Sequence, residues 1–384
     1  MLDNDMIEFL TYRNAMKSNY RKGVHALRCI LNNRKQAETF AGSLGGVSLV
    51  LGVSQPDGNS EALRALLEGS AVIDQATLTW LKNWWPEECG SWDTLAADQG
   101  RCSTIATDPF LWERVGVSPV GAGKILAGLV GQDSRNFAAM QAVASSATAM
   151  QAVAASPVAI AAIYRSDVAL SAVDSEASAA ATFYGADSVA MGKAVVILAG
   201  LDPAGYADMS AVAASATAMS AVAANYVALV ALYSNAEALS IAQGTTVGAA
   251  ALAGAGSVAT GKAAVKLAGL DPDDFADMAA VAASSTAMAA VAASATALDA
   301  LYAKKKRMSG GSASLSGKFI ILEISGGNAF KIGQYGYATL SDGSQPNWDN
   351  YKNKYAYFKQ FKKYATYMRN DTDGDDWIDY FQVS

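Results

Sequence analysis

Four consecutive decapeptides decide the fold: MSAVAASATA at 209–218, MSAVAANYVA at 219–228, LVALYSNAEA at 229–238 and LSIAQGTTVG at 239–248. Each decapeptide begins with a large apolar residue, and alanine is the commonest residue at the remaining positions of the four taken together. The seventh position is always a small polar residue: Ser215, Asn225, Asn235 and Thr245. Serine, asparagine and threonine are preferred N-cap residues because their side-chain oxygen accepts a hydrogen bond from a free backbone N–H. The stretch therefore predicts a new short helix about every ten residues.

The decapeptides belong to a larger repeat. Gly123-Lys124, Gly192-Lys193 and Gly261-Lys262 lie 69 residues apart, and methionines, valines and tyrosines recur at the same step. We therefore predict a mainly α-helical protein, in which residues 118–303 form an α-solenoid rod of short capped helices in three 69-residue repeats. The further positions that show the step are Met140, Met209 and Met278, Val143, Val212 and Val281, and Tyr164, Tyr233 and Tyr302.

The alternative to stacked short helices is one continuous helix in a coiled coil. A coiled-coil seam needs apolar residues every 3.5 residues on average, whereas a ten-residue step drifts by roughly 80° around an ideal helix. Prolines also interrupt the pattern, because Pro157, Pro203 and Pro272 each follow a Ser or Asp. Proline is favoured at the first position of a helix and breaks a helix elsewhere. The sequence favours stacked short helices.

The composition changes on both sides of the repeats. Residues 1–117 contain a cluster of tryptophans that indicates a compact core, and we expect an N-terminal helical domain there. The Gly/Ser-rich run Ser309–Ser314 predicts a flexible linker over residues 304–317. Beyond it, the apolar run Phe319–Ile324 and the alternation of Tyr335, Tyr337 and Thr339 indicate strands. Residues 318–384 are predicted to form a small β-rich tip domain.

Charge and hydropathy limit the partners. The net charge of −6 and the isoelectric point near 5.0 argue against nucleic acid as the main partner. The segment 209–234 carries no charge, but its alanines and serines contribute little to membrane insertion, so we expect no insertion. The first residues are acidic and lack the apolar core of a cleavable signal peptide.

No arrangement of residues predicts catalysis. The chain contains a single histidine, His25, and the segment Gly116–Lys124 lacks the spacing and the Ser or Thr of a phosphate-binding loop. No Ser/His/Asp or Cys/His set marks a hydrolase, and we predict that the protein is not an enzyme. Of the cysteines at 29, 89 and 102, Cys89 and Cys102 could form a disulfide, although reduced thiols are the favoured interpretation.

An acidic segment near the C-terminus predicts either a metal site or a turn. Carboxylates at Asp371, Asp373, Asp375 and Asp379 have the spacing of ligands for Ca²⁺, which takes six to eight oxygens. This spacing resembles the calcium loops of thrombospondin-type repeats, from which it departs at Asp376 and at Gln382. The alternative is a β-hairpin, in which residues 364–370 pair with residues 376–383. Calcium is the one cofactor that the sequence suggests.

A second candidate site is dense in tyrosine and lysine. Aromatic rings stack on sugars and lysines attract acidic groups, so this segment is a candidate receptor-binding surface for an anionic glycan. The simpler interpretation, which we favour, is that the aromatic residues form the core of the small domain and the lysines its solvated surface. The candidate receptor-binding residues are Tyr355, Tyr357, Lys359, Lys362, Lys363 and Tyr364.

The decapeptides at 140–159 and 278–297, of the form MxAVAASxTA, resemble alanine-rich repeats of bacteriophage fibre and receptor-binding proteins. The resemblance covers roughly residues 137–303. It implies a homotrimer located in the virion, with residues 1–117 attached to other virion proteins and residues 318–384 recognising a host surface glycan or protein. Two alternatives are a helical-repeat scaffold that binds a partner protein and a cell-surface adhesin.

Overall fold

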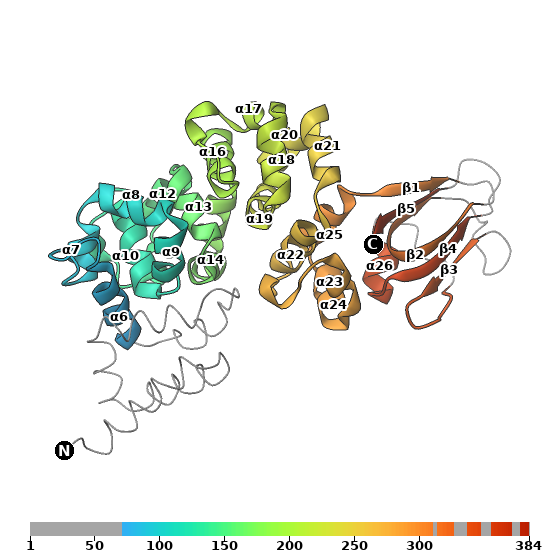
Figure 1. Cartoon of the computed structure of the whole chain (residues 1–384), viewed down its shortest axis with the longest axis horizontal. Coiled ribbons are helices and arrows are strands. Elements are labelled where there is room, and N and C mark those ends of the chain that lie inside the picture. Colours follow the sequence, from blue (N-terminus) through green and yellow to red (C-terminus); the bar gives the residue numbers. More distant parts are fainter. Residues whose placement is uncertain (1–70, 310–312, 326–335, 347–354, 371–376, 384) are drawn as a thin grey trace, which may run out of the picture. The chain divides into compact units, whose positions relative to one another are not determined.

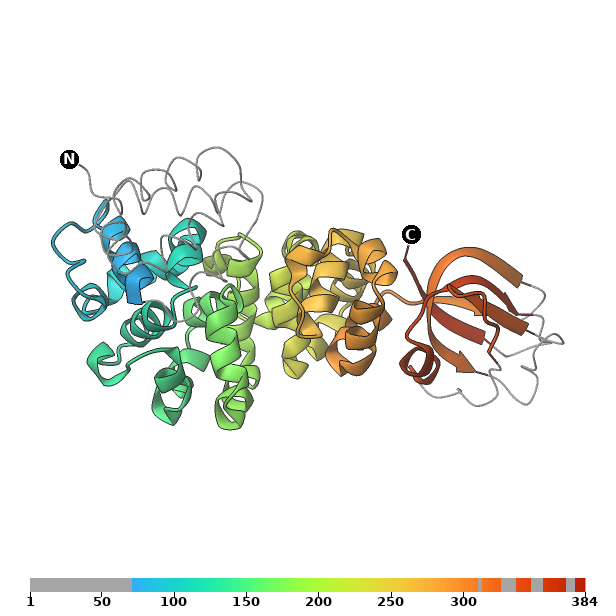
Figure 2. The ribbon, with the colours of Figure 1, turned by 90° about the horizontal axis from the view of Figure 1, so that it is seen from below.

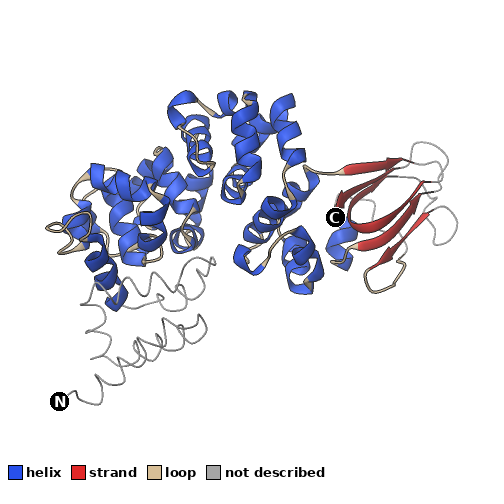
Figure 3. Ribbon diagram, in the orientation of Figure 1, coloured by secondary structure: helices blue, strands red, loops and turns tan. Residues whose placement is uncertain are grey.

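The computed structural model describes residues 71–309, 313–325, 336–346, 355–370 and 377–383. The chain is mainly helical and carries one small antiparallel sheet near its C-terminal end (Figures 1 and 3). The chain divides into two compact units, and the boundary between them along the sequence falls between Ala190 and Met191. The expected boundaries at 117/118 and 303/304 do not coincide with this division. Residues 1–70 of the expected N-terminal helical domain lie outside the described residues.

Tryptophans form part of the core of the first unit. Trp80, Trp92 and Trp112 are buried, which confirms the compact core expected there, and Trp112 Nε1 donates to the carbonyl of Ala162 at 2.7 Å. Trp84, in contrast, is 43% exposed. The helices that precede the repeats are α6 (Ala71–Leu81), α7 (Trp92–Ala96), α8 (Gln99–Thr107) and α9 (Pro109–Val115).

A longer helix followed by a 3₁₀ turn occurs three times among the described residues. The longer helices are α10 (Pro119–Leu129), α16 (Ser188–Leu198) and α22 (Ser257–Leu267), and the 3₁₀ turns are η1 (Ser134–Asn136), η2 (Pro203–Gly205) and η3 (Pro272–Asp274). Shorter helices follow each turn. They are α11 (Met140–Ala144), α12 (Ala147–Ala154), α13 (Pro157–Tyr164), α14 (Asp167–Asp174) and α15 (Ala177–Tyr184); α17 (Met209–Ala214), α18 (Ala216–Ala224), α19 (Tyr226–Ser234), α20 (Ala236–Gly244) and α21 (Thr246–Gly254); and α23 (Met278–Ala283), α24 (Ser285–Ala293) and α25 (Ala295–Tyr302).

The seventh residue of each decapeptide caps a helix, as its side chain predicts. Ser215, Asn225, Asn235 and Thr245 have extended backbone angles, and each side chain accepts a hydrogen bond from a backbone N–H two or three residues later. The helices before and after Asn225 are bent by 103°. No continuous helix crosses residues 209–239, so the coiled-coil alternative is wrong for this stretch.

The recurrent glycine of the Gly-Lys pair permits a close helix contact. A Cβ atom on Gly192 would lie 2.4 Å from the backbone nitrogen of Met209, and a Cβ on Gly261 would lie 2.5 Å from that of Met278. Gly123 has the same relation to Met140, at 2.4 Å. Any side chain at these positions would overlap the start of the helix that begins at the methionine, so packing accounts for the glycine of the pair.

The sheet has the strand order β1-β5-β2-β4-β3, and every neighbouring pair is antiparallel. Strand β2 is long and contains two register shifts, so its first half pairs with β4 and its second half with β5. The sheet is strongly curved (Figure 2). The strands are β1 (Lys306–Ser309), β2 (Ala313–Ser325), β3 (Gly336–Leu340), β4 (Ala365–Asn370) and β5 (Trp377–Gln382), and helix α26 spans Ala356–Phe361.

Alternate residues of β2 enter two different cores. Phe319 and Ile321 face a core enclosed by the sheet, together with Met368 and Ile378. Ile320 and Leu322 face the opposite way, into a second core that also contains residues of α22 to α25. We call this second core the helix–sheet core. Its members include Met288, Val291, Leu298, Leu301, Phe358 and Phe381.

Two predictions about the C-terminal part are wrong. The expected linker at 304–317 contains β1 and the first residues of β2, because Lys306–Ser309 pairs with β5 and Ala313–Ser316 pairs with β4. The expected hairpin does not form, because β2 lies between β4 and β5. Both strands of that hairpin are present, but each pairs with β2 instead of with the other.

Candidate functional site

Two of the candidate receptor-binding tyrosines are core residues. Tyr355 is 7% exposed and lies in the helix–sheet core, where its hydroxyl hydrogen-bonds a carboxylate oxygen of Asp299 at 2.7 Å. Tyr357 is 2% exposed and belongs to the core enclosed by the sheet. Neither ring is accessible to a sugar, so their assignment to a receptor surface is corrected. The simpler interpretation of the segment is confirmed for these two residues.

The remaining candidates do not form one aromatic surface. Lys359, Lys362 and Lys363 are exposed, and the ammonium of Lys363 forms a salt bridge with Asp342. Tyr364 is half-buried and packs against the helix–sheet core. The segment that is dense in tyrosine and lysine therefore contributes a core and a solvated surface.

The calcium candidates divide between described and undescribed residues. Asp371, Asp373 and Asp375 lie outside the described residues, whereas Asp379 is fully buried within β5. Arg307 donates to Asp379 from Nε at 2.7 Å and from Nη2 at 2.9 Å, and Lys305 Nζ donates at 2.6 Å. Both carboxylate oxygens thus face cations, and we correct the assignment of Asp379 as a calcium ligand.

The environment of Asp379 sets its pKa. Burial alone would raise the pKa of this carboxyl, but the hydrogen bonds from Arg307 and Lys305 outweigh burial and hold the pKa below its ordinary value of 3.8. The Arg307 guanidinium also lies 3.6 Å from the centre of the Trp377 ring. This cluster joins β1 to β5 and has a structural role.

The outer face of β2, β3 and β4 presents a different set of side chains. Ala338 and Leu340 of β3 are buried in the core enclosed by the sheet, so Tyr337 and Thr339 point outward. The same alternation turns outward a second set of residues on β4 and β2. We call the whole set the outer face: Tyr337, Thr339, Tyr367, Arg369, Ser314 and Ser316.

Two tyrosines are the main feature of this face. The ring centres of Tyr337 and Tyr367 are 5.4 Å apart and the rings are tilted by 34°. In the strand register Arg369 lies opposite Tyr337, and Thr339 lies opposite Tyr367. Gln345 Nε2 hydrogen-bonds the Thr339 hydroxyl at 3.0 Å at one end of the face.

The outer face suits binding rather than chemistry. Two adjacent rings provide an aromatic platform, while hydroxyls, an amide and a guanidinium provide hydrogen-bond partners around it. The sequence did not single out Tyr367 or Arg369 as site residues. The alternation of Tyr337 and Thr339 was the available signal, since it predicted one exposed side of β3.

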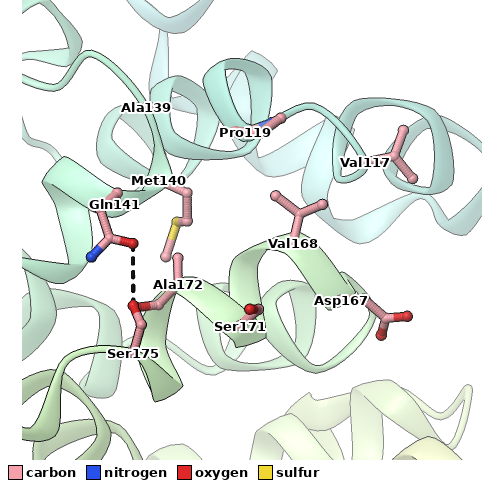
Figure 4. Close-up of a pocket in the computed structure, with 10 residues that line it drawn as sticks. All are labelled: Val117, Pro119, Ala139, Met140, Gln141, Asp167, Val168, Ser171, Ala172 and Ser175. Atoms are coloured by element: carbon pink, nitrogen blue, oxygen red, sulfur yellow. Dashed lines mark hydrogen bonds between the residues drawn. The ribbon is translucent and has the colours of Figure 1, made fainter. Parts of the chain in front are cut away.

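The first unit contains a groove of about 420 Å³ between α10, α11 and α14 (Figure 4). Its only charged lining residue is Asp167, and Ser175 Oγ hydrogen-bonds Gln141 Oε1 at 3.2 Å. Ser171 and six apolar residues complete the wall: Val117, Pro119, Ala139, Met140, Val168 and Ala172. This lining lacks an acid–base pair or an activated nucleophile.

The remaining reactive groups are held in structural contacts. The ammonium of Lys124, in the segment with the outline of a phosphate loop, is buried and pairs with Asp93 at 2.7 Å. Cys89 and Cys102 are buried free thiols, so the disulfide alternative is wrong in this structure. Burial raises the pKa of Cys89 to about 11 and that of Cys102 to about 12. Both sulfurs stay protonated near neutral pH.

Within the described ranges, no group of three or more His, Cys, Asp or Glu side chains could hold a metal ion. No single helix in that part of the chain has the length and apolar character to cross a membrane. Three pairs of consecutive helices meet these criteria only when the two helices of a pair are counted together. The two helices of each pair are bent relative to each other by 85° to 103°.

No family model matches the chain, and comparison with curated proteins finds no match.

Proposed function

We propose that this protein is a non-catalytic fibre protein of a bacteriophage virion and that its outer face recognises the host surface. The single observation that carries the proposal is the pair of half-buried tyrosine rings, Tyr337 and Tyr367, that lie side by side on the outer face. Rings held side by side by strand pairing are preorganised, so little side-chain entropy is lost when a ligand stacks on them.

The helical part supports the proposal as a scaffold for this face. The recurrence of α10, α16 and α22 at 69-residue steps, with the same glycine contact after each, supports an α-solenoid of three repeats. A stack of short helices that bury methionine and valine between neighbours needs no catalytic pocket. The resemblance of the decapeptides to phage fibre repeats suggests the location in the virion.

The proposal includes a division of roles and an oligomeric state. Residues 1–117 attach to other virion proteins, and the C-terminal β-domain contacts a host glycan or protein. The chain forms a homotrimer, because symmetric fibres gain stability by association. Multi-angle light scattering of the purified chain tests this, and a monomer at micromolar concentration contradicts it.

The recognition role is tested with the fluorescently labelled full chain on a panel of bacterial strains. We expect binding to a subset of strains and its loss in the double variant Y337A/Y367A. The matched control is K359A/K362A, which changes two exposed lysines outside the outer face and keeps binding. Binding that survives the loss of both tyrosines, or no binding to any strain, contradicts the proposal.

A further inference from the structure

We propose that the β-domain, which consists of the sheet and α26, ends the helical stack and prevents a second copy of this chain from docking on the last helices. This role is separate from host recognition. The inference rests on the α-solenoid of three repeats, which is part of the proposed function. The contacts of α23, α24 and α25 carry it.

The earlier short helices show what the last ones lack. In the first unit, α14 packs against α11 and α15 packs against α12. In the second unit, α20 packs against α17 and α21 packs against α18. Helices α23 and α24 begin the same pattern 69 residues further on, but no counterpart of α20 and α21 follows α25 in the described part of the chain. The faces of α23 and α24 that such a pair would occupy therefore need a different cover.

The chain departs from the helical pattern at Lys304. Ser166 and Asn235, which lie 69 residues apart, each cap the next helix by accepting a hydrogen bond from a backbone N–H. Lys304 stands at the same position of the third repeat, and its ammonium group has no lone pair to accept such a bond. It donates instead to the carbonyl of Ala255, and β1 begins two residues later. A further capped helix is thus excluded at this position by the side chain itself.

The β-domain supplies the cover. Val281 of α23 and Met288 and Val291 of α24 are buried in the helix–sheet core. All three are at most 1% exposed, like their counterparts in α17 and α18. Helix α26 contacts α24, and β5 contacts α25. The apolar side chains that the sheet and α26 contribute to this core are Ile320, Leu322, Phe358 and Phe381.

Two hydrogen bonds join α25 to the β-domain. The hydroxyl of Tyr302 donates to Glu323 Oε2 on β2 at 2.7 Å. The hydroxyl of Tyr355, directly before α26, donates to Asp299 Oδ1 at 2.7 Å. Because both bonds are partly buried, they add a defined orientation to the apolar contact.

Without the β-domain, the apolar faces of α23 and α24 would meet water. Two copies that expose the same face can pair about a twofold axis, because each then presents the same surface to the other. The burial of apolar surface would stabilise such a pair. The β-domain avoids this association, since the exposed side of α26 carries Lys359 and Gln360 and is polar, as a terminal element of a repeat stack requires.

Hydrogen–deuterium exchange of the full chain tests the cover. Phe358 and Phe361 both lie on α26, but Phe358 belongs to the helix–sheet core, whereas Phe361 packs against the core enclosed by the sheet. We expect F358A to accelerate amide exchange in α23 to α25 at least about tenfold, because the truncation opens a cavity against these helices. The matched control F361A should change this exchange less than about twofold. Exchange in α17 to α19 should stay the same in both variants.

Multi-angle light scattering of the same proteins tests the second copy. For the double variant F358A/F381A we expect a mass above that of the unmodified chain, and this mass should rise with protein concentration. F361A should keep the mass of the unmodified chain. Circular dichroism shows whether each variant keeps its helices, and the single variant F358A, for which we expect the same rise, decides the test if the double variant loses them.

Either measurement can contradict the inference. Unchanged exchange of α23 to α25 in F358A would show that the β-domain is not the cover of these helices. Accelerated exchange with an unchanged mass would show that the uncovered faces do not bind a second copy. Neither measurement uses host cells, so a failure here is distinct from a failure of host recognition.

Discussion

Asp379 shows how a single residue stabilises the C-terminal domain. Its carboxylate is fully buried and accepts three hydrogen bonds from Arg307 and Lys305. We expect D379N to lower the free energy of unfolding by about 2 kcal/mol, because an amide leaves the two cations without their counter-charge. Urea denaturation followed by tryptophan fluorescence measures the change. The exposed E237Q should stay within about 0.5 kcal/mol of the unmodified chain.

The same residue predicts a pH dependence. Because the pKa of Asp379 is lower in the folded protein than its ordinary value of 3.8, its contribution to the free energy of unfolding is present above about pH 4. The contribution is lost as the pH falls through the folded pKa. The difference in Tm between the unmodified chain and D379N should be constant from about pH 7 to 5 and shrink below about pH 4. A difference that does not change with pH would contradict this assignment.

The helix caps make a second prediction at the scale of one residue. Ser215 Oγ accepts a hydrogen bond from the backbone N–H of Ala218 at 3.2 Å. We expect S215A to destabilise the protein by about 1 kcal/mol, because that N–H loses its partner. S220A makes the same chemical change at an exposed position inside α18 and should be neutral or slightly stabilising. Equal effects of the two substitutions in urea denaturation would contradict the capping role.

At the scale of the element, the glycine contacts fix how helices approach each other. We expect G192A to cost about 2 kcal/mol, because its methyl group would lie 2.4 Å from the nitrogen of Met209 and would force α16 and α17 apart. Gly205 has open space around it, so G205A is the matched control. Differential scanning calorimetry should place the Tm of G192A several degrees below that of G205A. Equal Tm values for the two variants would show that α16 and α17 accommodate the added methyl group without loss of stability.

At the scale of the molecule, we expect the sheet and the last helices to unfold together. The helix–sheet core joins Leu298 and Leu301 of α25 to Ile320 and Phe381 of the sheet. A fragment of residues 191–384 matches the second compact unit and should unfold cooperatively. A fragment of residues 318–384 lacks β1 and this helical cover, and we expect it to give no cooperative transition. A folded 318–384 fragment would mean that the helices are dispensable for the β-domain.

Much of the helical part could be predicted from the sequence because its decisive interactions are local. The cap at Ser215 involves a backbone N–H only three residues away. Gly192 and Met209, which are in close contact, both recur at steps of 69 residues. The strand at 319–324 and the exposed side of β3 were also predictable, because their alternation is a property of neighbouring residues.

Only the tertiary structure decided which strands pair and which tyrosines are exposed. The partners of Asp379 lie 72 and 74 residues away along the chain, and no local sequence pattern indicates that they pair with it. Tyr355 and Tyr367 come from the same tyrosine-rich region, yet Tyr355 is covered by the last helices while Tyr367 lies on the outer face. Alternation distinguishes the two sides of a strand, but which side is covered depends on elements that fold against it from far away in the sequence. The physical reason is that a helix cap depends on hydrogen bonds within one helical turn, whereas the burial of a side chain depends on the packing of the whole domain.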